Sequence, residues 1–195
     1  ISLSAETIVK VHMETVESLV QNGFKRFIFM NSHGGNRAIT TFIVDQINQK
    51  TAAVAVDFSV AVSPFLKPEN TKNTTSLDRH AGVSETCDSL YLMPSLVEIE
   101  RATDPGMKLP KHLEKMLPEV IKEEPTAKLL FLSEALKAAE TGKKTSTIEM
   151  TKTGVWGELN PKQATVERGE ERVSKMVAAC RGFIDKWNEL TQQTI

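Results

Sequence analysis

Near the start of the chain, apolar side chains recur every three or four residues, which is the spacing of one helix face. That face carries Ile8, Val16 and Leu19. Ser4 is a favourable N-cap residue, and Gly23 follows the last apolar turn, as a glycine often does beyond a helix end. The pattern predicts a helix over residues 5–22.

Two short apolar runs flank a second stretch with helical spacing. Residues 26–31 read RFIFMN, and residues 51–62 read TAAVAVDFSVAV, so both are typical of buried strands. Residues 37–50 between them are predicted to form a helix. A strand, a helix and a strand in this order predict a βαβ unit with a right-handed crossover and a parallel sheet.

The second half of the chain contains two further helical patterns. Residues 83–94 are predicted to be helical, with Pro94 marking the end. Residues 163–191 are predicted to form a last helical region that Gly169 and Gly182 interrupt.

Two long stretches lack such a pattern. Residues 63–78 are rich in proline, asparagine and threonine and are predicted to form a long loop, a feature that is often functional. Residues 104–128 hold four prolines and many charges, which predicts an excursion over the surface.

Composition narrows the class of protein. The 195 residues are 40% hydrophobic, with a formal net charge of −1, which is typical of a globular domain and gives no electrostatic reason to expect nucleic acid or membrane partners. No apolar run approaches the roughly 20 residues that span a bilayer. Cys87 and Cys180 form no CxxC pair, which favours structural thiols in a reducing, cytoplasmic compartment.

A first candidate for chemistry is the sequence NSHGGN at residues 31–36, directly after the first predicted strand. Open parallel sheets place their ligands at this end of the strands. Gly34 and Gly35 permit close backbone approach, and His33 is a candidate metal ligand. A tight turn with a hydrogen-bonded histidine is the alternative.

A second candidate is HAGVSET at residues 80–86. If a helix begins near Val83, Glu85 lies in its first turn and can point back towards His80 at the loop end. Such a pair can bind a divalent metal or move protons. The alternative is that Glu85 complements the helix dipole.

A third stretch, residues 153–171, reads TGVWGELNPKQATVERGEE. Gly154 and Gly157 bracket Trp156, which indicates a strand or turn packed close to another segment. The tryptophan fits a core or interface position better than a substrate-stacking one.

Together these motifs resemble those of the creatininase (creatinine amidohydrolase) family. The matching residues read NSHGGN at 31–36, HAGVSET at 80–86 and GVWGELNPKQATVERG at 154–169, in the family's order. The resemblance implies a three-layer αβα sandwich with a mostly parallel sheet, formed by residues 1–195 as a single domain. It also implies hydrolysis of a C–N amide-type bond in a cyclic amide, formamide or related small molecule.

The resemblance implies roles for individual residues as well. Its members use two divalent metals, commonly zinc, manganese or iron, to activate water. By position, His33 and Glu85 are implied metal ligands, and His80 with Glu85 forms the implied catalytic pair. The same motifs supply candidates for substrate binding or loop shaping, namely Ser32, Gly34, Gly35, Asn36 and Trp156.

The family's first metal-binding segment, Glu-x-His followed by an aspartate, precedes an ISLS-like stretch, and this sequence begins at ISLS. Creatininase proper also has a glutamate ligand where Gly35 stands. His33 and Glu85 alone make a poor site for two hard cations. We therefore expect a domain incomplete at its N-terminus, with an unpaired sheet edge that a companion chain or a homo-oligomer contact covers.

Two alternatives belong to other functional classes. One is a catalytically silent subunit of the same fold with a binding or assembly role. An esterase-like α/β hydrolase is disfavoured because the sequence has no G-x-S-x-G nucleophile elbow.

Overall fold

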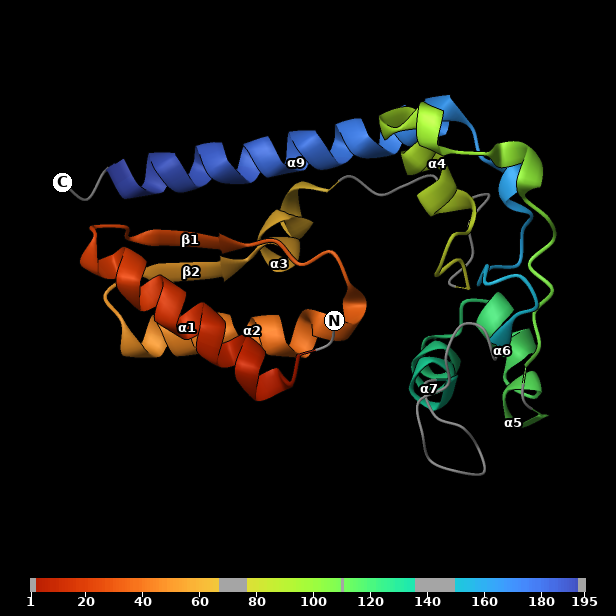
Figure 1. The fold of residues 1–195 in the computed structure, drawn as a ribbon, viewed down its shortest axis with the longest axis horizontal. Helices are drawn as coiled ribbons and strands as arrows, with labels where there is room; N and C mark the ends of the chain where they lie inside the picture. Colours follow the sequence, from red (N-terminus) through yellow and green to blue (C-terminus); the bar gives the residue numbers. More distant parts are fainter. Residues whose placement is uncertain (1–2, 67–76, 110, 136–149, 193–195) are drawn as a thin grey trace. The chain divides into compact units, whose positions relative to one another are not determined.

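The computed structural model describes residues 3–66, 77–109, 111–135 and 150–192. They fall into two compact units (Figure 1). The first unit comprises residues 1–67 and 177–195, and the second comprises residues 68–176. The long helix α9 (Val166–Gln192) contributes its last part to the first unit and its first part to the second. The prediction that residues 1–195 form one domain stays a prediction.

The first unit contains the predicted βαβ unit. It holds α1 (Ala5–Gln21), β1 (Arg26–Phe29), α2 (Arg37–Lys50), β2 (Val54–Asp57) and α3 (Phe58–Val62). The strands β1 and β2 are parallel, with Arg26 opposite Val54 and Phe29 opposite Asp57. No further strand joins this sheet within the described residues.

Three layers are visible in the first unit (Figure 1). Helices α1 and α2 cover one face of the sheet, and the part of α9 in this unit covers the other. Arg26 ties α9 to β1, because its Nη1 donates to Asn188 Oδ1 at 2.8 Å and its guanidinium lies 5.5 Å from the Trp187 ring centre. The αβα architecture expected from the sequence is thus present. The buried core of this unit consists of Val16, Ile43, Ile47, Ala53 and Ala55.

The predicted ends of the first two helices are confirmed to within one residue. Ser4 caps α1, its Oγ accepting a hydrogen bond from the Thr7 N–H at 3.2 Å. Gly23 follows that helix with a φ of +91°, a left-handed conformation that glycine adopts without steric cost.

Both predicted strands are shorter in the structure. The strand predicted over residues 26–31 ends at Phe29, and the strand predicted over 51–62 is wrong in extent because it covers only Val54–Asp57. Asp57 Oδ1 accepts hydrogen bonds from the Ser59 N–H at 2.9 Å and the Ser59 hydroxyl at 2.6 Å. This N-cap starts α3 where the β-branched sequence alone predicts more strand.

The second unit is helical. It holds α4 (Val83–Leu92), α5 (Lys111–Glu114), α6 (Leu117–Ile121), α7 (Pro125–Ala135) and the first part of α9. The helix predicted up to Pro94 is confirmed, since α4 ends at Leu92 and Pro94 begins a 3-10 turn. Of the loop predicted over 63–78, residues 67–76 lie outside the described residues.

The prediction of a surface excursion over residues 104–128 is wrong. Leu113 and Val120 are fully buried in a core that this segment shares with α7. Pro118 and Pro125 lie in the first turns of α6 and α7. Proline is favourable there because no intrahelical hydrogen bond needs its missing N–H, so these prolines start helices rather than exclude them.

The prediction that Gly169 and Gly182 interrupt the last helix is also wrong. Helix α9 runs without a break from Val166 to Gln192. A Cβ at Gly169 would lie 2.0 Å from the Cys87 carbonyl oxygen, so this glycine lets α9 and α4 pack closely. Among the helices described, none is both long and apolar enough to cross a membrane.

Candidate functional site

The loop that links β1 to α2 carries the first motif at the carboxyl end of the sheet. Asn31 holds this loop at two points, because its Oδ1 accepts from the His33 N–H at 3.1 Å and its Nδ2 donates to the His33 carbonyl at 2.8 Å. The His33 carbonyl also accepts from the Asn36 N–H at 3.0 Å, which starts the 3-10 turn Gly34–Asn36. The backbone of His33 is therefore fixed while its side chain is exposed.

The imidazole of His33 lies over Gly35. A Cβ at position 35 would be 2.9 Å from His33 Nε2, closer than real Cβ contacts, whereas a Cβ at Gly34 would meet nothing within 4 Å. Gly35 therefore leaves room for the histidine ring in this orientation. Any larger residue at position 35 would require the ring to move.

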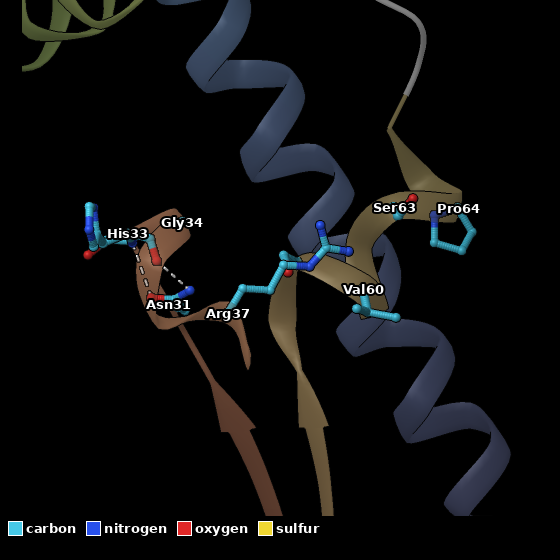
Figure 2. A pocket seen from close by; sticks show the side chains of 9 residues that line it. Asn31, His33, Gly34, Arg37, Val60, Ser63 and Pro64 are labelled. Carbon is cyan, nitrogen blue, oxygen red and sulfur yellow. Dashed lines mark hydrogen bonds between the residues drawn. The ribbon is translucent and has the colours of Figure 1, made fainter. Parts of the chain in front are cut away.

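A cavity of about 580 Å³ opens beside this loop (Figure 2). Its walls come from the β1–α2 loop and from the α3 segment that follows β2, so it lies where ligands bind to open α/β sheets. The lining residues are Asn31, Ser32, His33, Gly34, Arg37, Ser59, Val60, Ser63 and Pro64. Asn36 does not line this cavity; its carbonyl instead accepts from Thr40 Oγ1 at 3.1 Å.

The second motif lies in the second unit, at the start of α4. Glu85 Oε2 accepts a hydrogen bond from the Ala81 N–H at 2.7 Å, so the carboxylate reaches back to the residue after His80. Ala81 has a φ of +52°, in the left-handed region that non-glycine residues rarely occupy. The hydrogen bond from Ala81 to Glu85 therefore helps to hold a strained turn beside His80.

Trp156, from the third motif, holds the backbone of His80. The two residues form an antiparallel bridge in which the Trp156 N–H donates to the His80 carbonyl at 2.8 Å. Their rings meet edge to face with centres 6.0 Å apart. Trp156 is buried, with 4% of its surface exposed, while the His80 side chain is exposed. This placement gives Trp156 a supporting position under the His80 loop.

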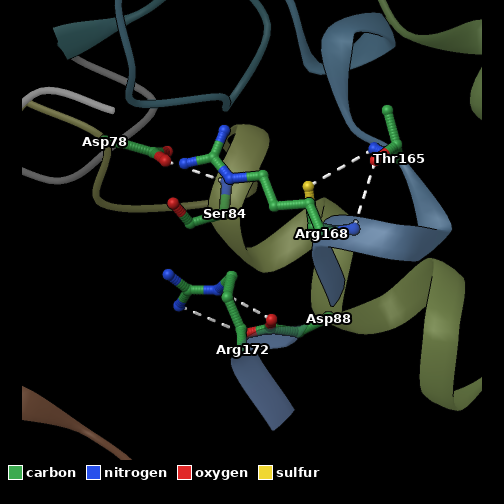
Figure 3. A network of polar contacts seen from close by, with 7 residues as sticks. Asp78, Ser84, Asp88, Thr165, Arg168 and Arg172 are labelled. Carbon is green, nitrogen blue, oxygen red and sulfur yellow. Dashed lines mark hydrogen bonds and ion pairs between the residues drawn. The ribbon is translucent and has the colours of Figure 1, made fainter. Parts of the chain in front are cut away.

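Asp78 is a residue of this region that the sequence reasoning missed (Figure 3). Its Oδ2 accepts from the Ser84 N–H at 2.9 Å and so caps α4. A Cβ at Gly82 would lie 1.6 Å from Asp78 Oδ1, so the glycine makes room for this carboxylate. The sequence held one indication of this role. Gly82, at the N-cap position, has no side chain to cap the helix, so another residue has to accept the free N–H groups.

Polar contacts also hold α4 against the first part of α9 (Figure 3). Arg172 Nε donates to Asp88 Oδ1 at 2.8 Å, and its Nη2 lies 3.4 Å from Asp88 Oδ2. The Thr165 N–H lies 3.4 Å from the buried Cys87 Sγ. These contacts fix the helix that carries Glu85.

Comparison with known proteins identifies the family. The family model described as creatininase, creatinine amidohydrolase, matches residues 1–184. The chain belongs to the creatininase family. The resemblance inferred from the three sequence motifs is confirmed, and so is the fold that it implied.

Solved structures of creatininases share the fold. A Bacteroides fragilis NCTC 9343 protein designated a creatinine amidohydrolase aligns over 94% of this chain and 62% of its own, with a TM-score of 0.58 and 23% identity. A creatininase variant of the Zn–Zn type aligns over 97% of this chain and 65% of its own, with a TM-score of 0.60 and 18% identity. A manganese form of creatininase aligns over 97% of this chain and 65% of its own, with a TM-score of 0.59 and 18% identity.

The chain thus spans less than two thirds of the length of these creatininases. No curated protein matches the chain.

The residues described do not by themselves fit the metal centre expected of a creatininase. No group of three or more histidine, cysteine, aspartate or glutamate side chains within them is arranged to hold a metal ion. Among the described residues that line the cavity beside the β1–α2 loop, His33 contributes an imidazole and none contributes a carboxylate. A two-metal centre would need several such donors, and so would need ligands beyond this set.

Proposed function

We propose that the chain is part of a metal-dependent amidohydrolase that cleaves a C–N amide-type bond in a cyclic amide, formamide or related small molecule. The observation that carries this proposal is the family match over residues 1–184, which includes all three motifs. The position of His33 on a cavity at the carboxyl end of parallel strands supports it. Two divalent ions, of zinc, manganese or iron, would supply Lewis acidity and activate water.

In this proposal each motif has a separate role. His33 is a metal ligand whose remaining partners lie outside the described residues. His80 presents an exposed imidazole, a group that can transfer a proton to a leaving nitrogen. Glu85 is a metal ligand or a carboxylate that assists this transfer. Trp156 positions the His80 loop, since it is buried beneath it.

Four further residues shape the loop that carries His33 in this proposal: Ser32, Gly34, Gly35 and Asn36. The first two line the cavity, Gly35 leaves space for the His33 ring, and the Asn36 N–H closes the turn. These four positions determine which orientation the imidazole adopts towards a ligand.

A catalytically silent subunit of the same fold remains the second candidate. The observation that favours it is the missing donor set, because the described residues hold no group of three metal-binding side chains. In this alternative the cavity beside His33 would bind a small molecule without hydrolysing it.

Assembly with a further segment or subunit forms part of the proposal. The two strands pair only with each other among the described residues, and Val54 at this sheet is half-exposed, at 50%. Free strand edges favour pairing with another segment. We therefore propose a homo-oligomer or a companion chain that also supplies metal ligands.

The substitution Glu85→Gln tests the proposed chemistry. Glutamine keeps the length of the side chain and a carbonyl oxygen that can accept the Ala81 N–H, while it removes the negative charge. We expect hydrolysis of a panel of cyclic amides and formamides, creatinine included, to fall by about 100-fold or more, with an unchanged melting temperature. Chromatographic measurement of substrate loss and product formation, a ring-opened acid from a cyclic amide and formate from a formamide, gives the rate.

Glu98→Gln is the matched control, since Glu98 is exposed and pairs with Arg101 on the surface. We expect this variant to retain the activity of the unmodified protein. Full activity in Glu85→Gln would contradict a chemical role for the carboxylate and would leave only the hydrogen bond to Ala81 as its function.

A further inference from the structure

The cavity beside His33 contains a positive charge, that of Arg37, which no described carboxylate pairs with. Arg37 opens α2, and its guanidinium extends into the cavity towards the α3 segment, near Val60 and Ser63 (Figure 2). None of the described residues that line the cavity is acidic. Within the described part of the chain, Arg37 forms no ion pair with any carboxylate, unlike the arginines at positions 101, 172 and 181.

The polar groups around Arg37 are hydrogen-bond donors suited to an anion. The hydroxyls of Ser32 and Ser63 line the cavity and make no hydrogen bond to other described residues. The Ser59 hydroxyl is committed, because it donates to Asp57 Oδ1 at 2.6 Å. Among the described side chains, the guanidinium and these two hydroxyls are therefore donors available to a ligand.

Asp57 is an acidic residue at this end of the sheet, but among the described residues it does not line the cavity. It is 7% exposed and is absent from the lining residues, and its Oδ1 is occupied by Ser59. A ligand in the cavity would therefore meet the cation of Arg37 and no carboxylate of the described residues.

We propose that this cavity binds an oxyanion group, a carboxylate or a phosphate, carried by the substrate, and that Arg37 determines this specificity. The inference rests on the proposed function, because it places the anionic group beside His33, where the amide would be cleaved. A guanidinium presents its N–H groups as a fork that matches the two oxygens of a carboxylate or phosphate. Substrates with an amide and a nearby anionic group fit this site better than neutral amides.

Binding of paired probes to the purified protein tests the proposal. N-acetylglycine and N-acetylglycinamide have nearly the same shape, but only the first carries a carboxylate. Titration calorimetry is performed in the presence of a chelator, because carboxylate and phosphate also bind divalent metals. We expect N-acetylglycine to bind about tenfold or more tightly than N-acetylglycinamide, the usual gain from a hydrogen bond to a charged group.

The substitution Arg37→Gln should abolish this preference, while Lys50→Gln should preserve it. Lys50 ends the same helix α2, is exposed and lies outside the cavity, so the control changes the net charge equally. A thermal melt of each variant verifies that the fold is retained. Inorganic phosphate serves as a third probe, and tighter binding of phosphate than of N-acetylglycine, lost in Arg37→Gln, would assign the site to phosphate groups.

Two results would overturn the proposal. One is that the unmodified protein shows no preference for the anionic probes, including the case in which it binds none of them. The other is that Arg37→Gln retains the preference. Neither result bears on amide hydrolysis or metal content, because the titrations involve no turnover and no metal, so a failure here is distinct from a failure of the proposed function.

Discussion

Replacing His33 by alanine is expected to lower the rate of amide hydrolysis by more than about 100-fold. Mutating a residue that only hydrogen-bonds to a metal ligand typically lowers metal affinity or activity by about 10- to 100-fold, and loss of a ligand itself should cost more. The fold should be retained, because the contacts of His33 with Asn31 and Asn36 use its backbone. The exposed imidazole makes no hydrogen bond to another described residue. Steady-state rates and a thermal melt of the variant measure the two effects.

His12→Ala is the matched control in the same unit. His12 is also an exposed imidazole, and its Nδ1 lies 2.8 Å from the Ile8 carbonyl of its own helix. We expect this variant to keep its activity. Equal losses of activity in both variants would mean that histidine substitutions disturb the unit generally and would count against a special role for His33.

The largest effect on stability is expected for Gly169→Ala. The added Cβ would lie 2.0 Å from the Cys87 carbonyl oxygen and 2.9 Å from Tyr91 Cβ. Because backbone atoms cannot move aside as a flexible side chain does, α9 must shift away from α4. We expect a loss of about 3 kcal/mol in the free energy of unfolding, measured by denaturant titration.

Gly182→Ala on the same helix provides the comparison. Its Cβ would meet only the edge of the Phe65 ring, at 2.9 Å from Cδ1, and that ring can turn. Alanine also favours the helix by about 1 kcal/mol over glycine. The free energy of unfolding should therefore change by no more than about 1 kcal/mol in this variant. A stability of Gly169→Ala equal to that of Gly182→Ala would refute the close contact between α4 and α9.

The sequence predicted the parts of the fold that depend on local signals. Ser4 and Gly23 mark the two ends of α1. Ser4 accepts a hydrogen bond from a backbone N–H three residues on, and Gly23 adopts a positive φ. Both effects depend on nearby residues only, so the helix ends were predictable. The parallel pairing of β1 and β2 followed from their order along the chain.

The wrong predictions concern residue types that can play either of two structural roles, where tertiary packing determines which role applies. Proline usually interrupts helices, but Pro118 and Pro125 start them. Glycine lowers helix propensity, but Gly169 sits inside α9 because a buried carbonyl needs its space. Asp57 stands in a strand-like sequence, but its side chain caps α3.

For the candidate site, residue types were predictable and their neighbours were not. His33, His80 and Glu85 stand out because of their motifs. Arg37 and Asp78 were missed, since their roles follow from a cavity wall and from a helix start that only the folded backbone creates. The role of His33 as a metal ligand stays a prediction, because the described residues contain no group of three or more metal-binding side chains.

The metal content of the native protein that carries this sequence tests the central claim most directly. Elemental analysis by plasma mass spectrometry, combined with the intact mass of every chain that copurifies, should find about two divalent ions per site. The intact masses should also reveal the segment or subunit that supplies the missing ligands. A protein that remains metal-free after incubation with zinc and manganese would contradict the account and favour the catalytically silent subunit.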